Sequence, residues 1–185
     1  MTTPIQNIQE IGQSVWYDNI SREMIESGGL QKLIDSGVTG LTSNPTIFQK
    51  AITESSDYDA ALTELAKADK SDSEIFEAMG IADIQAAADL LRPAFDATRG
   101  DDGYASFEVN PHLAHDTKGT VEEARRLFAA IDRPNVMIKV PATPEGIPAV
   151  EQLIGEGINV NITLIFSLES HKQVIEAYIS GLEEL

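Results

Sequence analysis

Short apolar runs of strand length alternate along this chain with segments whose apolar residues recur at helical spacing. Such alternation predicts βα units, in which each strand is followed by a helix and the strands lie parallel in one sheet. The predicted strands are residues 14–19, 38–44, 104–110, 136–141 and 158–166. The sequence therefore predicts an α/β fold, in a single domain, with five βα units.

Capping residues and prolines predict where several helices begin and end. Thr3-Pro4 predicts the start of the first helix, and residues 143–145 (Thr-Pro-Glu) predict the start of the helix after the fourth strand. Gly157 lies where that helix should end. Helical spacing in residues 120–131 and 146–156 agrees with these limits.

The segment from residue 45 to residue 99 is too long for one crossover. Gly80 and Pro93 predict breaks within it, so we expect several helices between the second and third strands. Residues 168–185 predict a final helix.

Five βα units fit two architectures, an open doubly wound sheet or part of a (β/α)8 barrel, which takes about 250 residues. In a doubly wound sheet apolar helices cover both faces, so polar residues belong at the strand ends. In a barrel one face looks inward and carries the chemistry near the C-terminal mouth.

Side chains at positions i and i+2 of a strand share a face, and this rule separates polar from apolar residues in all five predicted strands. The polar face contains Asp18 with Trp16, Thr42 with Asn44, Ser106 with Glu108, Lys139 with Met137, and Asn159 with Asn161 and Thr163. This pattern favours the TIM barrel, with its first five βα units in this chain.

Composition excludes several classes of function. The 30 acidic and 13 basic residues give a net charge of −17, which repels nucleic acids and anionic membrane surfaces. The absence of cysteine excludes disulfides, thiol nucleophiles and thiolate metal ligands. No apolar run approaches the roughly 20 residues of a membrane span, and the N-terminus does not resemble a signal peptide. We expect a cytoplasmic protein; its oligomeric state stays open.

Lys139 interrupts the apolar run VMIKVPAT at residues 136–143. A lysine inside a buried strand must be paired, reach water along its stem or lose its proton. A neutral amine in an apolar pocket can attack a carbonyl and form a Schiff base, and Asp18 and Glu108 are candidate general acids and bases. A purely structural lysine and a phosphate-binding lysine are the alternatives, although no glycine-rich phosphate loop adjoins Lys139.

Two histidines, His112 and His115, lie close to Glu108 and Asp116 in the sequence. They lack a third ligand at a recognised spacing, so we predict no metal site.

Several motifs together resemble the transaldolase family. GLTSNPTIF (40–48) resembles one family signature, and MIKVPATPEGIPAV (137–150) resembles the signature around the Schiff-base lysine. EIGQSVWYDNISR (10–22), SFEVNPHLAHD (106–116) and GINVNITLIFS (157–167) are similar to strands 1, 3 and 5 of the family. The first and last of these motifs look most like the longer bacterial subgroup.

This resemblance implies a (β/α) barrel that moves a dihydroxyacetone unit between sugar phosphates without a cofactor, in the pentose phosphate pathway. Sedoheptulose 7-phosphate and glyceraldehyde 3-phosphate would give erythrose 4-phosphate and fructose 6-phosphate. The implied catalytic residues are Lys139 as Schiff-base lysine, Asp18 as acid–base, and Glu108 and Thr163 as the pair that positions a water. The implied substrate-binding residues are Thr42, Ser43, Asn44 and Asn161.

The resemblance also implies three further strands and a phosphate-binding serine and arginine after strand 6. We therefore expect residues 1–185 to be the N-terminal part of one barrel domain, ending after strand 5 and its helix, and to be inactive alone. A related class I aldolase, such as a fructose-6-phosphate aldolase, and a non-catalytic remnant are the alternatives.

Overall fold

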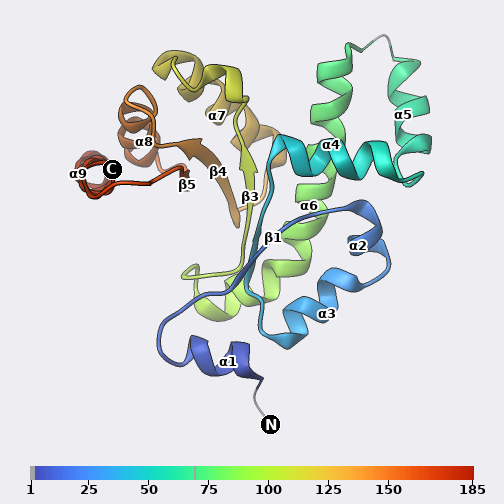
Figure 1. The fold of residues 1–185 in the computed structure, drawn as a ribbon, viewed down its shortest axis with the longest axis horizontal. Coiled ribbons are helices and arrows are strands. Elements are labelled where there is room, and N and C mark those ends of the chain that lie inside the picture. Colours follow the sequence, from blue (N-terminus) through green and yellow to red (C-terminus); the bar gives the residue numbers. More distant parts are fainter. Residues whose placement is uncertain (1–2, 69) are drawn as a thin grey trace. The chain divides into compact units, whose positions relative to one another are not determined.

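The computed structural model describes residues 3–68 and 70–185, in which strands alternate with helices along the chain (Figure 1). The strands are β1 (Trp16–Asp18), β2 (Gly40–Thr42), β3 (Tyr104–Glu108), β4 (Val136–Pro141) and β5 (Val160–Thr163). Their order in the sheet follows their order in the chain. This is the order of the first five βα units of a (β/α)8 barrel, so the predicted fold class is confirmed.

The helices are α1 (Pro4–Gln9), α2 (Arg22–Glu26), α3 (Gly29–Ser36), α4 (Pro45–Glu54), α5 (Asp59–Ala66), α6 (Asp72–Thr98), α7 (Thr117–Ile131), α8 (Gly146–Gly155) and α9 (Leu168–Glu184), with a 3-10 turn, η1 (Pro111–Leu113). None of the helices in the described part of the chain combines the length and the apolar composition that a bilayer span requires.

The predicted helix limits are largely confirmed. Thr3 caps α1 through a reciprocal pair of hydrogen bonds with Gln6, and Pro4 takes the first helical position. Helix α8 begins at Gly146, directly after residues 143–145, and the amide of Gly146 donates a hydrogen bond to the Thr143 hydroxyl at 2.9 Å. Gly157, at φ 75°, follows the end of that helix as expected.

The chain divides into two compact units, and the division runs through β3. The first unit contains the described residues up to 105 together with residues 133–135, and the second contains residues 106–132 and 136–185.

In the first unit, β1 pairs with β2 in parallel, and Trp16 lies opposite Gly40. A Cβ on residue 40 would come within 2.4 Å of the Trp16 ring, so this position accepts only glycine unless the ring moves. The indole N–H donates to an Asp102 carboxylate oxygen at 3.1 Å. Helices α2, α3 and α5 pack against α6.

Helix α6 is one continuous helix of 27 residues, so the predicted breaks at Gly80 and Pro93 are wrong. Gly80 is buried, and packing of this part of α6 outweighs the roughly 1 kcal/mol that a helical glycine costs. Pro93 is exposed, so water can solvate the backbone carbonyl that a proline leaves without its helical partner.

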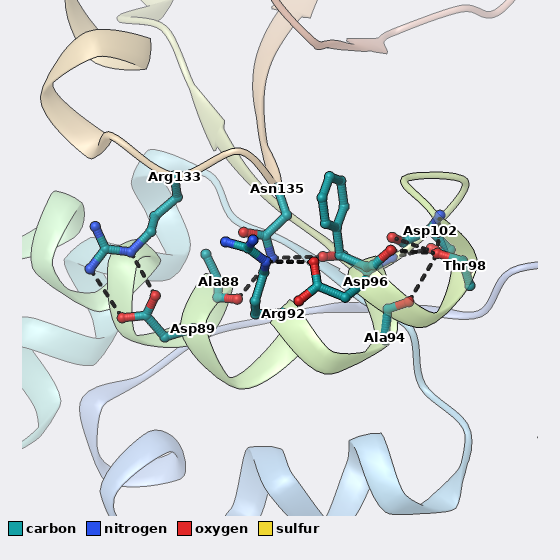
Figure 2. A network of polar contacts seen from close by, with 11 residues as sticks. Ala88, Asp89, Arg92, Ala94, Asp96, Thr98, Asp102, Arg133 and Asn135 are labelled. Atoms are coloured by element: carbon teal, nitrogen blue, oxygen red, sulfur yellow. Dashed lines mark hydrogen bonds and ion pairs between the residues drawn. The ribbon is translucent and has the colours of Figure 1, made fainter.

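Polar contacts hold the C-terminal half of α6 in place (Figure 2). The Asn135 side-chain amide donates to the carbonyls of Ala88 at 2.8 Å and Gly103 at 2.9 Å. Arg133 forms an ion pair with Asp89, and the Thr98 hydroxyl accepts from the Asp102 amide at 3.1 Å. These contacts tie both sides of the Pro93 position to neighbouring segments, which explains why the helix continues through it.

In the second unit, the Val109 amide donates to the Lys139 carbonyl at 3.1 Å, which joins the end of β3 to β4. Strand β4 pairs with β5 in parallel, with Lys139 opposite Asn161 and Pro141 opposite Thr163. Helix α8 packs against both α7 and α9.

The contact between α8 and α9 is close at Gly181. A Cβ there would lie 2.5 Å from the carbonyl oxygen of Glu151 and 2.8 Å from the Cβ of Ile154. At Gly155, on the facing helix, the nearest atoms would lie at 3.3 Å or more. Gly181 therefore sets the distance between the two helices.

Four of the five strands are shorter than predicted, and only β4 matches its predicted limits. The second predicted strand ends early because Asn44 caps α4, accepting a hydrogen bond from the Ile47 amide at 2.9 Å. The fifth ends early because Leu164 adopts a left-handed conformation with φ 63°. The apolar residues 164–166 extended the fifth prediction beyond the point where local backbone geometry ends the strand.

Candidate active site

Lys139 lies in the middle of β4 with only 7% of its surface exposed. Its neighbours Ile138 and Val140 are fully buried. Its Nζ lies 3.4 Å from Oε2 of Glu108, whose side chain is 16% exposed. Lys139 is therefore one half of a nearly buried ion pair, which is the first of the three ways in which a buried strand can hold a lysine.

A second polar contact connects β5 with β3. The side-chain amide of Asn161 donates to the Ser106 hydroxyl at 3.0 Å, and Ser106 is fully buried. Asn161 lies opposite Lys139 in the β4–β5 pairing, so the two side chains point to one face. The contacts of Ser106, Glu108, Lys139 and Asn161 agree with the assignment of alternate residues to one polar face.

Thr163, at the C-terminal end of β5, is half-buried and lies opposite Pro141. It is separated from Asn161 by one residue, so both belong to the polar face of β5. The second unit thus carries four of the eight predicted site residues on three consecutive strands.

The first unit carries the other four. Asp18 ends β1, is exposed, and lies opposite the half-buried Thr42 in the β1–β2 pairing. Ser43 is fully buried. The side-chain oxygen of Asn44 caps α4, so this part of the side chain has a structural role.

Asp18 also lines a cleft of about 500 Å³ in the first unit. The segment after β1 forms one wall, and residues of α4 with the loop after it form the other. The charged lining residues are Asp18, Glu23, Lys50, Glu54 and Asp57. Four carboxylates and one ammonium group give the cleft a negative potential, which favours neutral hydroxylated ligand groups over anionic ones.

The sequence patterns did not reveal a buried cluster formed by Arg22, Tyr58 and Asp83. Arg22 donates to one carboxylate oxygen of Asp83 through Nε at 3.0 Å and Nη2 at 2.8 Å. The Tyr58 hydroxyl donates to the other oxygen at 2.6 Å. Burial raises the pKa of Tyr58, and its hydrogen bond to Asp83 raises it further, so Tyr58 stays a donor at neutral pH.

One feature of the sequence could have revealed part of this cluster. Asp83 is a carboxylate among the buried apolar positions of α6, such as Met79, Ile84 and Ala87, where an unpaired charge is costly. Its partners are 61 and 25 residues away in the sequence, beyond the reach of any local pattern.

The two histidines lie outside the polar face. His112 is part of the exposed turn η1, and His115 Nδ1 lies 3.1 Å from Oε2 of Glu145. Within residues 3–68 and 70–185, no three His, Cys, Asp or Glu side chains gather in a metal-binding arrangement.

The order of the βα units and the buried lysine beside a carboxylate define a barrel-type α/β protein with an ionisable site on its strands. A family model described as "Transaldolase/Fructose-6-phosphate aldolase" matches residues 15–183. The chain belongs to the transaldolase/fructose-6-phosphate aldolase family.

Curated relatives agree with this assignment. The chain is 49% identical over 185 residues to "Transaldolase 2" of Streptomyces avermitilis, 50% identical over 184 residues to "Transaldolase" of Trichodesmium erythraeum, and 50% identical over 185 residues to "Transaldolase" of Thermobifida fusca. These alignments cover 99–100% of this chain and 48–50% of each relative. The chain therefore spans about half the length of the curated relatives that it matches.

Proposed function

We propose that this chain contributes the catalytic lysine and its proton-transfer partners to a transaldolase, which transfers a dihydroxyacetone unit from a ketose phosphate to an aldose phosphate. The observation that carries the proposal is the nearly buried Lys139, 3.4 Å from Glu108, within a chain of this family. An amine held beside a carboxylate can attack a carbonyl carbon and exchange protons without a cofactor.

In the proposed reaction, the Lys139 ammonium group first passes a proton to the carboxylate of Glu108. The neutral amine then adds to the ketose carbonyl, and water leaves to form a protonated imine. Asp18 removes the proton from the hydroxyl two carbons beyond the imine carbon. The carbon–carbon bond then breaks, an aldose phosphate leaves, and the imine takes up the electron pair as an enamine. Addition to an acceptor aldehyde and hydrolysis of the new imine return free Lys139.

Glu108 is proposed to hold, together with Thr163, the water that carries protons while the imine forms and hydrolyses. Its carboxylate already lies beside the Lys139 Nζ, which supports this role. The half-buried Thr163 hydroxyl is the second proposed contact of that water.

Thr42, Ser43, Asn44 and Asn161 are the proposed ligands of the dihydroxyacetone hydroxyls. The Asn161 amide nitrogen is bonded to Ser106, so the proposal assigns its carbonyl oxygen to the substrate. For Asn44 the proposal assigns the amide nitrogen, because the oxygen caps α4. The acidic cleft beside Asp18 is suited to the neutral hydroxyls of the sugar and unsuited to its phosphate.

Because the chain spans about half of its relatives, we propose that residues 1–185 form the N-terminal part of the barrel domain and are inactive alone. Five strands without the rest of a barrel would leave unpaired strand edges and an open core. Turnover by the 185-residue chain at the level of its full-length relatives would contradict this part of the proposal. The cytoplasmic location stays a prediction.

Borohydride trapping tests the mechanism. The chain, extended to the length of its relatives, is incubated with fructose 6-phosphate and borohydride, and the modified peptide is identified by mass spectrometry. We expect one dihydroxyacetone adduct on Lys139, no adduct in Lys139→Met, and an unchanged adduct in the matched control Lys32→Met, which removes an exposed lysine. An adduct on any other residue, or none, refutes the mechanism.

A fructose-6-phosphate aldolase is the second candidate, because the description of the matching family model names this activity as well. The two functions differ in the fate of the enamine after cleavage. A transaldolase retains the enamine until an acceptor aldose phosphate arrives, whereas the aldolase releases free dihydroxyacetone. Release of dihydroxyacetone without an acceptor, at the rate of the coupled reaction, would favour the aldolase.

A further inference from the structure

The buried cluster of Arg22, Tyr58 and Asp83 begins four residues after Asp18. Arg22 is the first residue of α2, and its backbone N–H, which has no partner within the helix, donates to the Tyr58 hydroxyl at 3.0 Å. Its guanidinium lies over the Tyr58 ring, 4.4 Å from the centroid, and donates twice to Asp83. The Tyr58 hydroxyl thus accepts a hydrogen bond from the backbone of α2 and donates one to Asp83 of α6.

The cluster also joins the two walls of the cleft that Asp18 lines. One wall is the segment from Asp18 to Ser21, which leads directly into Arg22. The other wall ends with Ser55 and Asp57, which lead directly into Tyr58. The hydrogen bond from the Arg22 amide to the Tyr58 hydroxyl is therefore a direct link between the walls.

Asp18 is consequently held from both sides. On its N-terminal side, the parallel pairing of β1 with β2 fixes the strand. On its C-terminal side, Ile20 is fully buried and the cluster fixes the start of α2. The Asp18 side chain is exposed. The position of its backbone is therefore set by the strand before it and by the start of α2 after it.

We propose that Tyr58 and Asp83 are positioning residues for Asp18: they anchor the start of α2 and thereby set where the Asp18 carboxylate lies in the cleft. This inference rests on the proposed function, in which Asp18 takes the proton from the substrate hydroxyl. Tyr58 and Asp83 are buried and neither lines the cleft, so the proposal assigns them an effect on Asp18 and no contact with the substrate.

The expected consequence concerns the rate of the proton transfer. A displacement of about 1 Å can slow a catalysed step about a hundredfold. Since the proposed role of Asp18 comes after the substrate is bound as an imine, its displacement lowers kcat and leaves KM nearly unchanged.

The test compares two tyrosine-to-phenylalanine variants in the protein extended to the length of its relatives. Tyr58→Phe removes the hydroxyl that links the walls. Tyr104→Phe is the matched control, because its hydroxyl is also part of a buried residue and donates one hydrogen bond, to the Gly100 carbonyl at 2.6 Å, without contacting α2. We expect Tyr58→Phe to lower kcat about tenfold or more at constant KM, and Tyr104→Phe to leave both constants unchanged.

Hydrogen exchange supplies a readout that does not depend on turnover. In the 185-residue chain, the Arg22 amide should exchange about tenfold faster in Tyr58→Phe than in Tyr104→Phe, because only the first variant loses its acceptor. Asp83→Asn, which keeps the shape of the side chain but removes its charge, should lower kcat in the same direction as Tyr58→Phe.

The outcomes separate this inference from the proposed function. If Asp18→Asn retains the wild-type kcat, the proposed role of Asp18 fails. If Asp18→Asn is inactive but Tyr58→Phe matches Tyr104→Phe in kcat and in the exchange of the Arg22 amide, the positioning role is overturned and the proposed function stands.

Discussion

The ion pair between Lys139 and Glu108 predicts that Glu108→Gln and Lys139→Met lower the free energy of unfolding by unequal amounts. The double substitution should recover most of the stability that Glu108→Gln loses. Glu108→Gln leaves a lysine that is 7% exposed without its charged partner. Lys139→Met replaces the ammonium group with an apolar end of similar length. The double variant has neither charge, so the site contains no unpaired buried ion.

The distance between the two charged groups sets the expected loss of stability. Two unit charges 3.4 Å apart interact by about 5 kcal/mol at an effective dielectric constant of about 20. Desolvation of both groups offsets part of this, and removal of one partner of a buried pair typically costs about 3–5 kcal/mol. We therefore expect Glu108→Gln to lower the free energy of unfolding by about 3 kcal/mol, which corresponds to roughly 6–12 °C in Tm for a chain of this size.

Urea denaturation of the wild type and the three variants measures the coupling between the two residues. We expect Lys139→Met to cost less than Glu108→Gln, because the Glu108 side chain is more exposed and water still solvates part of its charge. The double variant should lie within about 1 kcal/mol of Lys139→Met in the free energy of unfolding. Additive effects, with a coupling below about 0.5 kcal/mol, would refute the view that the pair is energetically buried.

Three further predictions concern the packing of α8 and α9, the cap of α4 and a surface ion pair. Gly181→Ala should lower the free energy of unfolding by about 1–2 kcal/mol, because the added methyl group overlaps the backbone of α8. Gly155→Ala should be neutral or stabilising. Equal urea midpoints for the two variants would contradict the close approach of α9 to α8 at Gly181. Asn44→Ala should lower the free energy of unfolding by about 1 kcal/mol, because the helix cap is lost. Asn44→Ser should restore the stability of the wild type but not its KM. If Asn44→Ser restored both, the role of Asn44 would be structural only. Arg125 lowers the pKa of the Glu156 carboxyl below its ordinary value of 4.5, so their ion pair stabilises the fold above pH 4.5, and this contribution is lost as the pH falls through the lowered pKa. The difference in urea midpoint between the wild type and Arg125→Gln should therefore shrink as the pH is lowered below 4.5, and a constant difference would exclude this linkage.

The prediction of the βα order succeeded because its signals are local. Hydrophobic periodicity and helix-start signals such as Thr3-Pro4 and Thr143-Pro144 act over one or two turns of chain, and α1 and α8 begin where these signals predict. The breaks predicted at Gly80 and Pro93 were wrong because burial and tertiary contacts support α6, and among these contacts are bonds to Ala88 and Asp89 from Asn135 and Arg133, 47 and 44 positions away.

The same distinction between local signals and distant contacts applies to the candidate site. The sequence by itself determined that Lys139 lies in an apolar strand and that Glu108 and Asn161 belong to the polar faces of their strands, because side-chain direction alternates with a fixed period of two. Only the tertiary structure decided that Glu108 is the partner of Lys139 and that Tyr58 joins Arg22 to Asp83. Which buried charges meet depends on the pairing and packing of distant segments, and no local pattern encodes that choice.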